Sequence, residues 1–237
     1  LNELKKTGKP IAMVLFTGRP LALTNVKDIP DAMLNVWFSG TEAGHAIADV
    51  LFGKVNPSGK LPVTFPRSLG QVPIYYNDKN TGRPLSAEKT DKCEYDRFRA
   101  NYMDECNTPL YPFGYGLSYT SFTYSDMSVS NTNPKGNQTV QVSVNLKNSG
   151  NYDGAEVVQL YIRDLVGSIT RPVKELKGFQ KVFLKKGESK KVTFNITPED
   201  LKFYNNALKY DWEEGEFDMM IGTNSANVQH TKIYWSK

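Results

Sequence analysis

Residues 139–148 read TVQVSVNLKN, and in them an apolar side chain alternates with a polar one. This period of two is typical of a strand with one buried face. The alternation recurs in FTYSDMSVS (122–130), EVVQLYIRD (156–164), KELKGFQKVFL (174–184), ESKKVTFNI (188–196), LKYDW (208–212), EFDMMIG (216–222) and HTKIYWS (230–236). Turn sequences such as NPKG, NSG, KKGE and EEG separate these runs. Short strands with such turns predict an antiparallel β-sandwich over residues 122–237.

The stretch just before the sandwich, LYPFGYGLSYTSF (110–122), is neither a good strand nor a good helix. Gly114 and Gly116 weaken both structures, and a proline at position 112 blocks a helix interior. Aromatic rings gain much free energy from burial. We therefore expect an ordered connector in which Tyr111, Phe113 and Tyr115 clamp two domains together. The alternative is an aromatic core strand with glycine bulges.

The first part of the chain has a different pattern. IAMVLF (11–16) and AMLNVWF (32–38) are continuous apolar runs, typical of strands buried on both faces of a parallel sheet. Thr41 is expected to cap a helix that stops at Gly53, and LPVTF (61–65) is expected to be a further strand. The opening LNELKKTGKP resembles the end of a helix, so we expect a fragment whose sheet edge depends on strands outside it or on another copy.

These patterns predict an α/β layer fragment followed by an all-β immunoglobulin or fibronectin type III-like sandwich. The expected boundaries are 1–76 for the α/β portion, 77–121 for a long loop with the connector, and 122–237 for the sandwich. A polar loop as long as residues 71–107 is usually functional or disordered. Cys93 and Cys106 in this loop form a disulfide in an oxidising compartment or remain thiols in the cytosol.

Composition narrows the classes of partner. The net charge is only +4, and the densest basic cluster (Lys185, Lys186, Lys190 and Lys191) is better explained as a lysine-guarded strand edge than as a nucleic-acid surface. We expect no nucleic-acid partner. No apolar run is long enough to span a membrane. Two cysteines and two distant histidines do not suggest a metal site.

Several motifs occur together in a fixed order. GKPIAMVLFTGRPLAL, WFSGTEAGHAIADVLFGKVNPSGKLPVTFPRSLGQVPIYY, NTGRP and LYPFGYGLSYTSF resemble the C-terminal part of glycoside hydrolase family 3 β-glucosidases. RPVKELKGFQKV and GEFDMMIGTNSA resemble the fibronectin type III-like domain of that family. Each motif is weak alone, but the ordered set covers almost the whole chain.

The resemblance implies a retaining β-glycosidase that acts on β-glucoside oligosaccharides. Retention uses two carboxylates roughly 5 Å apart, one as nucleophile and one as acid/base. In the family both lie upstream of the segment matched here, so no residue of this chain is assigned a catalytic role. The resemblance implies no cofactor and no metal, and a periplasmic or secreted location. It is compatible with a homo-oligomer. Sugar linkage and aglycone stay open.

Substrate contacts are expected from the long loop, through Asn80, Thr81, Arg83, Tyr102 and Asp104, because tyrosine rings and polar groups suit sugar recognition. The alternative is that this region anchors one domain to another. Many relatives read approximately Ser-Arg-Tyr-x-Asp where this chain has ANYMD (100–104). The role of that missing arginine is therefore in question.

Other candidates are weaker. Adjacent acids (Asp104 and Glu105, Glu213 and Glu214, Asp91 and Glu94) are usually only solvated. GKVNPSGK (53–60) departs from a phosphate loop in its glycine spacing and in the leucine that follows it. Core packing is favoured over sugar stacking for Trp37 and Phe38, and Trp212 and Trp235 also fit a packed core. A non-catalytic carbohydrate-binding or protein-interaction module is the alternative function.

Overall fold

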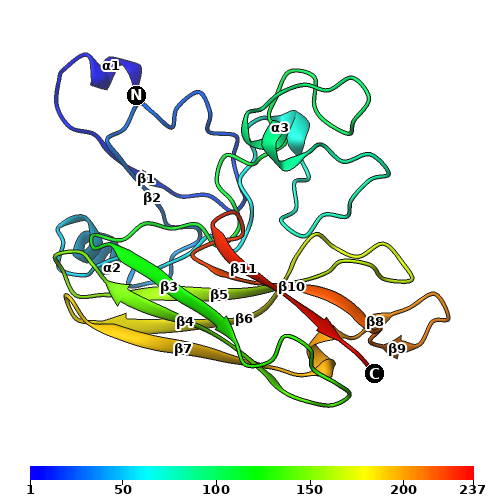
Figure 1. Cartoon of the computed structure of the whole chain (residues 1–237). Coiled ribbons are helices and arrows are strands. Elements are labelled where there is room, and N and C mark those ends of the chain that lie inside the picture. The colour runs from blue at the N-terminus through cyan, green and yellow to red at the C-terminus, as the bar shows by residue number, and fades with distance from the viewer. The chain divides into compact units, whose positions relative to one another are not determined.

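The structure is a computed structural model that describes residues 1–237 (Figure 1). The chain forms two compact units, each built from separate stretches of sequence. The first contains Leu1–Val55, Val63–Tyr75 and Leu85–Pro112, and the second contains Asn56–Pro62, Tyr76–Pro84 and Phe113–Lys237. Two short segments from the first half of the chain therefore pack with the second half.

The second unit is an antiparallel β-sandwich (Figure 1). One sheet has the order β3-β4-β7, made of Phe122–Val129, Val140–Asn148 and Ser189–Ile196. The other has the order β11-β10-β5-β6, made of Val228–Trp235, Gly215–Gly222, Gly154–Asp164 and Glu175–Leu184. A 3₁₀ turn, Pro198–Leu201, leads to the short pair β8 (Phe203–Tyr204) and β9 (Tyr210–Asp211). The predicted α/β portion followed by a sandwich is thus confirmed.

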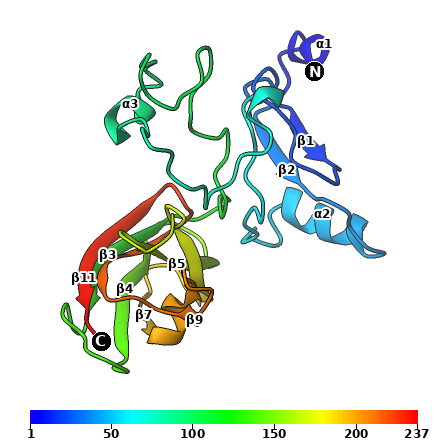
Figure 2. The ribbon, with the colours of Figure 1, turned by 90° about the vertical axis from the view of Figure 1, so that its right-hand side faces the viewer.

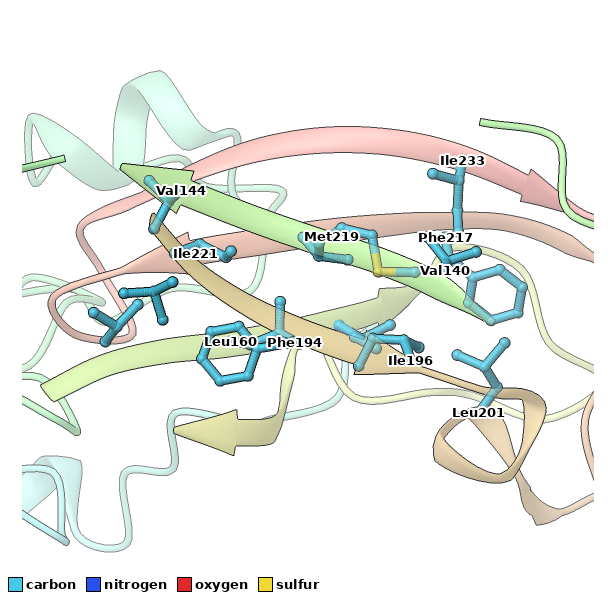
Figure 3. Packing of buried hydrophobic residues seen from close by; sticks show 14 of the residues in the cluster. Val140, Val144, Leu160, Phe194, Ile196, Leu201, Phe217, Met219, Ile221 and Ile233 are labelled. Carbon is cyan, nitrogen blue, oxygen red and sulfur yellow. The ribbon is translucent and has the colours of Figure 1, made fainter. Parts of the chain in front are cut away.

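The sandwich core consists of the alternate apolar residues of both sheets. Figure 3 shows Val140 and Val144 of β4, Phe194 of β7, Leu160 of β5 and Met219 of β10 packed together, the first three from one sheet and the last two from the other. All five are buried. Trp212 and Trp235 lie in the same core, edge to face at 6.1 Å between ring centroids, as their strand pattern predicted. The period-two pattern therefore identified the buried face correctly.

Two details of the sandwich differ from the sequence prediction. The run 208–212 forms only the two-residue strand β9, and its partner β8 was not predicted. Both strands are very short, so neither offers the repeated alternation that identifies a strand. The lysine-rich strand is an edge as expected, because β7 pairs with β4 alone.

The first unit contains a parallel pair of strands, β1 (Ala12–Leu15) and β2 (Ala32–Asn35), in the register Ala12↔Ala32 (Figure 2). Asp31 supports the start of this pair, because its carboxylate accepts the backbone N–H of Ile11 at 2.8 Å. Helix α2 (Ala43–Leu51) follows β2. The unit also contains α1 (Asn2–Lys5), the 3₁₀ turn Leu69–Gln71 and α3 (Ala87–Asp91). None of these helices combines the length and apolar character that a membrane crossing requires.

Three local predictions for the first 65 residues were wrong. Residues 61–65 form no strand; the N–H of Phe65 instead donates to Tyr111 at 2.9 Å, in an isolated bridge. Pro62 lies inside this segment and Pro66 follows it, and neither has an N–H to donate to a neighbouring strand. Helix α2 begins after Glu42 without a side-chain cap, so Thr41 is not its N-cap. Phe38 is 87% exposed and does not belong to a core in this chain, whereas Trp37 does pack on Phe65, at 5.8 Å.

The connector is ordered but is not a strand. Gly114 has a φ of +79°, and an added Cβ there would overlap the side chain of Gln159. A Cβ on Gly116 would overlap the carbonyl oxygen of Gly59. Both glycines are therefore required, as the sequence indicated, and the alternative of an aromatic core strand is excluded. The proposed clamping of two domains by Tyr111, Phe113 and Tyr115 stays a prediction.

Candidate functional site

The five predicted substrate residues fall into two groups. Asn80, Thr81 and Arg83 lie in the segment 76–84, which packs with the sandwich, and their side chains are exposed. Tyr102 and Asp104 lie in the 93–107 loop of the first unit and are also exposed. Each group is available for contact with a ligand. That the five act on one substrate stays a prediction.

Segment 76–84 is attached to the sandwich by an aromatic contact and by its backbone. The ring of Tyr76 stacks on Phe113, with centroids 4.2 Å apart, and meets Tyr161 edge to face at 5.9 Å. The N–H of Leu176 donates to the Tyr76 hydroxyl at 3.3 Å. The N–H of Val173 donates to the backbone carbonyl of Asp78 at 2.8 Å. This hydrogen bond lies beside an isolated bridge that pairs Lys79 with Pro172.

Charged groups surround the same attachment. Burial raises the pKa of the Asp78 carboxyl, and the charges of Lys174 and Arg163 oppose that rise. Burial lowers the pKa of Lys174, and the Asp78 charge opposes the fall. Lys174 Nζ also donates to the backbone carbonyl of Ser225 at 2.5 Å. Asp218 completes the group of charges and lies 3.3 Å from His230 Nδ1.

The second group of residues lies on a loop that is closed covalently. Cys93 and Cys106 form a disulfide, which decides between the two states that the sequence left open. Asp96 pairs with Lys89 at 2.7 Å, and this hydrogen bond is the main cause that lowers the pKa of Asp96. Asp96 Oδ1 also accepts the N–H of Phe98 at 3.1 Å. The loop is thus held at its base and at its turn.

Asn101, at the position where the family resemblance suggested an arginine, holds this turn together. Asn101 Nδ2 donates to the carbonyl oxygens of Asp96 and Arg99, at 2.7 Å and 2.8 Å. Asn101 Oδ1 accepts the N–H of Asp96 at 3.2 Å. An arginine has no acceptor and could not make the last bond. Asn101 therefore has a local structural role in this loop.

The other sequence candidates have structural partners. Lys60, the last residue of the rejected phosphate loop, pairs with Glu156 at 3.0 Å and donates to the carbonyl of Gly116 at 3.0 Å. Glu156 also accepts from the Tyr124 hydroxyl at 3.2 Å. Glu213 accepts the N–H of Ser168 at 2.7 Å. No group of three or more His, Cys, Asp or Glu side chains is arranged to hold a metal ion.

The sequence prediction missed the attachment residues Tyr76, Asp78 and Lys174. Tyr76 and Lys174 both lie inside motifs that carried the family resemblance, QVPIYY (71–76) and RPVKEL (171–176), which were interpreted only as marks of the family. Nothing in sequence spacing links positions about a hundred residues apart. Their proximity depends on the fold.

The first unit also contains an open hollow of about 600 Å³ between β2 and α2. Its walls are mainly apolar and include Leu34, Val36, Ala46, Ile47 and Val50. Ser39, Thr41 and Glu42 also line the hollow, but most of its surface is apolar, whereas a sugar is fixed by several convergent polar groups. We therefore do not assign it as the substrate site.

Comparison with known proteins agrees with this architecture. The family description "Glycosyl hydrolase family 3 C-terminal domain" matches residues 1–119, half of the chain, and "Fibronectin type III-like domain" matches residues 156–225. The chain belongs to glycosyl hydrolase family 3. The attachment of segment 76–84 is thus a feature of a family 3 C-terminal region, and the sandwich is its fibronectin type III-like domain.

Individual relatives extend the match over nearly the whole chain. The chain is 53% identical to a periplasmic β-glucosidase of Salmonella typhimurium, over 97% of this chain and 29% of that protein. It is 43% identical to a putative β-xylosidase of Formosa agariphila, over 100% of this chain and 29% of that protein. A crystal structure of a β-glucosidase from Listeria innocua in complex with glucose has a TM-score of 0.93 and 42% identity, over 100% of this chain and 32% of the other. The chain thus spans about a third or less of the length of these relatives.

Proposed function

We propose that the protein containing this chain is a retaining β-glucosidase that removes terminal non-reducing β-D-glucosyl residues from oligosaccharides. The observation that carries the proposal is the 53% identity to the Salmonella β-glucosidase over 97% of the chain. The two carboxylates that retention requires would lie upstream of the matched segment. The chain itself would contribute substrate contacts through Asn80, Thr81, Arg83, Tyr102 and Asp104.

The same comparison supports further parts of the proposal. A periplasmic or secreted location would follow from the Salmonella relative, and the Cys93–Cys106 disulfide is compatible with an oxidising compartment. The half-exposed strands β1 and β2 would be covered by upstream segments of the parent or by a second copy in a homo-oligomer. The mild net charge gives no reason to expect a nucleic-acid partner.

The test compares the parent with the isolated chain on aryl β-glucosides. The parent should release nitrophenol, and the isolated 237-residue chain should not, because both carboxylates would be absent. Measuring an aryl β-xyloside in parallel decides the sugar, since one relative is named a β-xylosidase. Turnover by a rigorously purified chain would contradict the assignment of both carboxylates to the upstream part.

A second candidate function is non-catalytic carbohydrate binding by the sandwich. The observation in its favour is a pair of exposed tyrosines on the β8–β9 hairpin, Tyr204 (65% exposed) and Tyr210 (57% exposed), with ring centroids 5.1 Å apart. Exposed aromatic rings can stack on sugar rings. Retention of the isolated sandwich on insoluble β-glucan, lost in Tyr204→Ala with Tyr210→Ala, would establish this function. Equal retention of both proteins would eliminate it.

A further inference from the structure

Residues 76–84, here called the strap, are fixed to the sandwich at successive points. Tyr76 is held between Phe113 and Tyr161 at the beginning of the strap. The N–H of Val173 then donates to the backbone carbonyl of Asp78, and the adjacent Lys79 pairs with Pro172 in an isolated bridge. Asn80 follows directly after these attachments. The exposed side chains proposed to contact substrate thus begin where the anchored backbone ends.

A chain of hydrogen bonds next to Asp78 also belongs to this attachment. The Asp78 carboxyl interacts with the charges of Lys174 and Arg163, which belong to the sandwich. Lys174 is itself tied to the 223–226 turn through the carbonyl of Ser225. The N–H of Ser225 in turn donates to the carbonyl of Phe113 at 2.9 Å, next to the ring on which Tyr76 stacks. Lys174, Ser225 and Phe113 are therefore connected by hydrogen bonds to the ring on which Tyr76 stacks.

We propose that the fibronectin-like sandwich is the platform that fixes the strap, and that Tyr76 is the positioning residue through which it orients Asn80, Thr81 and Arg83 toward substrate. This inference rests on the proposed function for the role of those three side chains. A loop that is ordered before substrate arrives loses less conformational freedom on binding, so its contacts contribute more to affinity. The sandwich thereby affects substrate binding without touching the sugar.

The attachment can be measured on the 237-residue chain itself, without activity. The amides of Val173 and Leu176 are the reporters, because each donates a hydrogen bond to the strap. Tyr76→Leu should accelerate hydrogen exchange at both amides by about tenfold. Tyr76→Phe, which keeps the ring but removes the acceptor, should affect Leu176 alone. Tyr75→Leu is the matched control, since the adjacent Tyr75 is exposed, and should leave both amides unchanged.

The positioning role is measured on the full-length parent. Tyr76→Leu should raise KM for an aryl β-glucoside about tenfold at nearly constant kcat, as expected for loss of binding shared by ground and transition states. Arg83→Ala should also raise KM. In the double variant the two effects should be much less than additive, because Arg83 no longer has a fixed position once the strap is released. Tyr75→Leu should keep the parent's KM.

The outcomes separate this inference from the proposed function. Unchanged hydrogen exchange at Val173 and Leu176 in Tyr76→Leu would overturn the inference that the sandwich fixes the strap through Tyr76. If Arg83→Ala raises KM but Tyr76→Leu does not, the substrate role of the strap survives and the positioning role is overturned. Fully additive effects would also overturn it. A parent without glycosidase activity would refute the proposed function, and the exchange experiment would still decide whether the sandwich fixes the strap.

Discussion

The two units differ in how completely they bury their apolar residues. In the sandwich, the inward-facing residues of β4, β5 and β10 are almost wholly buried, whereas no residue of β1, β2 or α2 is buried. Both regions have apolar sequences of strand type. The difference is that each sheet of the sandwich finds its partner sheet inside the chain. An apolar sequence therefore indicates that a segment has side chains to bury. Only the fold shows whether other segments of this chain bury them.

The largest expected effect is a core truncation in the sandwich. Phe217 is 2% exposed and lies in the main core, so Phe217→Ala should lower the free energy of unfolding by about 4 kcal/mol. Leu34→Ala, in the half-exposed strand β2, should cost less than about 1 kcal/mol, because little buried area is lost. Urea unfolding followed by tryptophan fluorescence measures both. Equal losses of unfolding free energy in the two variants would contradict the difference in burial between the two units.

The sandwich was the more predictable of the two regions. Alternation located seven of its strands, and the turn residues between them set their limits. In the first unit, the parallel pair was predicted correctly from two apolar runs, but the expected burial and the third strand were not found. Residues 61–65 have the composition of a strand, yet Phe65 bonds to Tyr111, more than forty residues later. Periodicity describes one segment and does not identify its partner.

The second expected effect concerns the buried ion pair of Lys60 and Glu156, whose side chains are 11% and 4% exposed. Lys60→Met should cost about 3 kcal/mol at pH 7, because it leaves the Glu156 carboxylate buried without its cation. The sandwich core would be destabilised by a change in a segment that precedes it by many residues. Urea unfolding of the 237-residue chain at several pH values measures the effect.

The stability cost of Lys60→Met should depend on pH, and the pKa of Glu156 gives the direction of that dependence. Burial raises the pKa of Glu156 above its ordinary value of 4.5, so ionisation of this group opposes folding. Its contribution to stability is therefore greatest below the unfolded pKa and is lost as the pH rises through the folded pKa. The cost of Lys60→Met should shrink as the pH falls from 7 toward 4.5, since Glu156 can then be neutral. Glu3→Gln, at an exposed site, is the control and should show no such trend. A pH-independent cost would contradict the mechanism.

The third expected effect concerns the connector. Phe113 is half-buried and stacks on Tyr76, so Phe113→Ala should cost about 2 kcal/mol, less than a full core truncation. Leu117→Ala, four residues later and largely exposed, should change stability by less than about 0.5 kcal/mol. In the parent, the melting temperature measures both. A cost for Phe113→Ala as large as that for Phe217→Ala would place the connector in a core rather than at its margin.

The candidate site shows the same limit of sequence reasoning. The exposed side chains Asn80, Thr81 and Arg83 could be selected from sequence because polar loop residues suit sugar recognition. Tyr76 and Lys174 could not be connected to them, because the contacts depend on where the strap meets the 172–176 segment. The departure at position 101 was visible in the sequence, but its consequence was not: an amide both donates and accepts, and only the fold brings the carbonyls of Asp96 and Arg99 to it.

The smallest expected effect lies in the first unit, in the disulfide-closed loop. Asn101→Ala removes the amide that bridges the turn at Asp96 and should cost about 1 kcal/mol of local stability, which is roughly a fivefold increase in the open population. Arg97 and Arg99 flank Phe98 in this turn, so trypsin reports the opening directly. Cleavage in the loop should therefore be about fivefold faster in Asn101→Ala while the sandwich stays intact.

Fragments stay linked through Cys93 and Cys106, so the cut must be detected after reduction. Asn206→Ala, on the β8–β9 hairpin, is the control and should not change cleavage in the loop. Unchanged cleavage in Asn101→Ala would mean that the disulfide and the Lys89–Asp96 pair hold the turn without Asn101, and faster cleavage within β5 would show that the two units do not open separately.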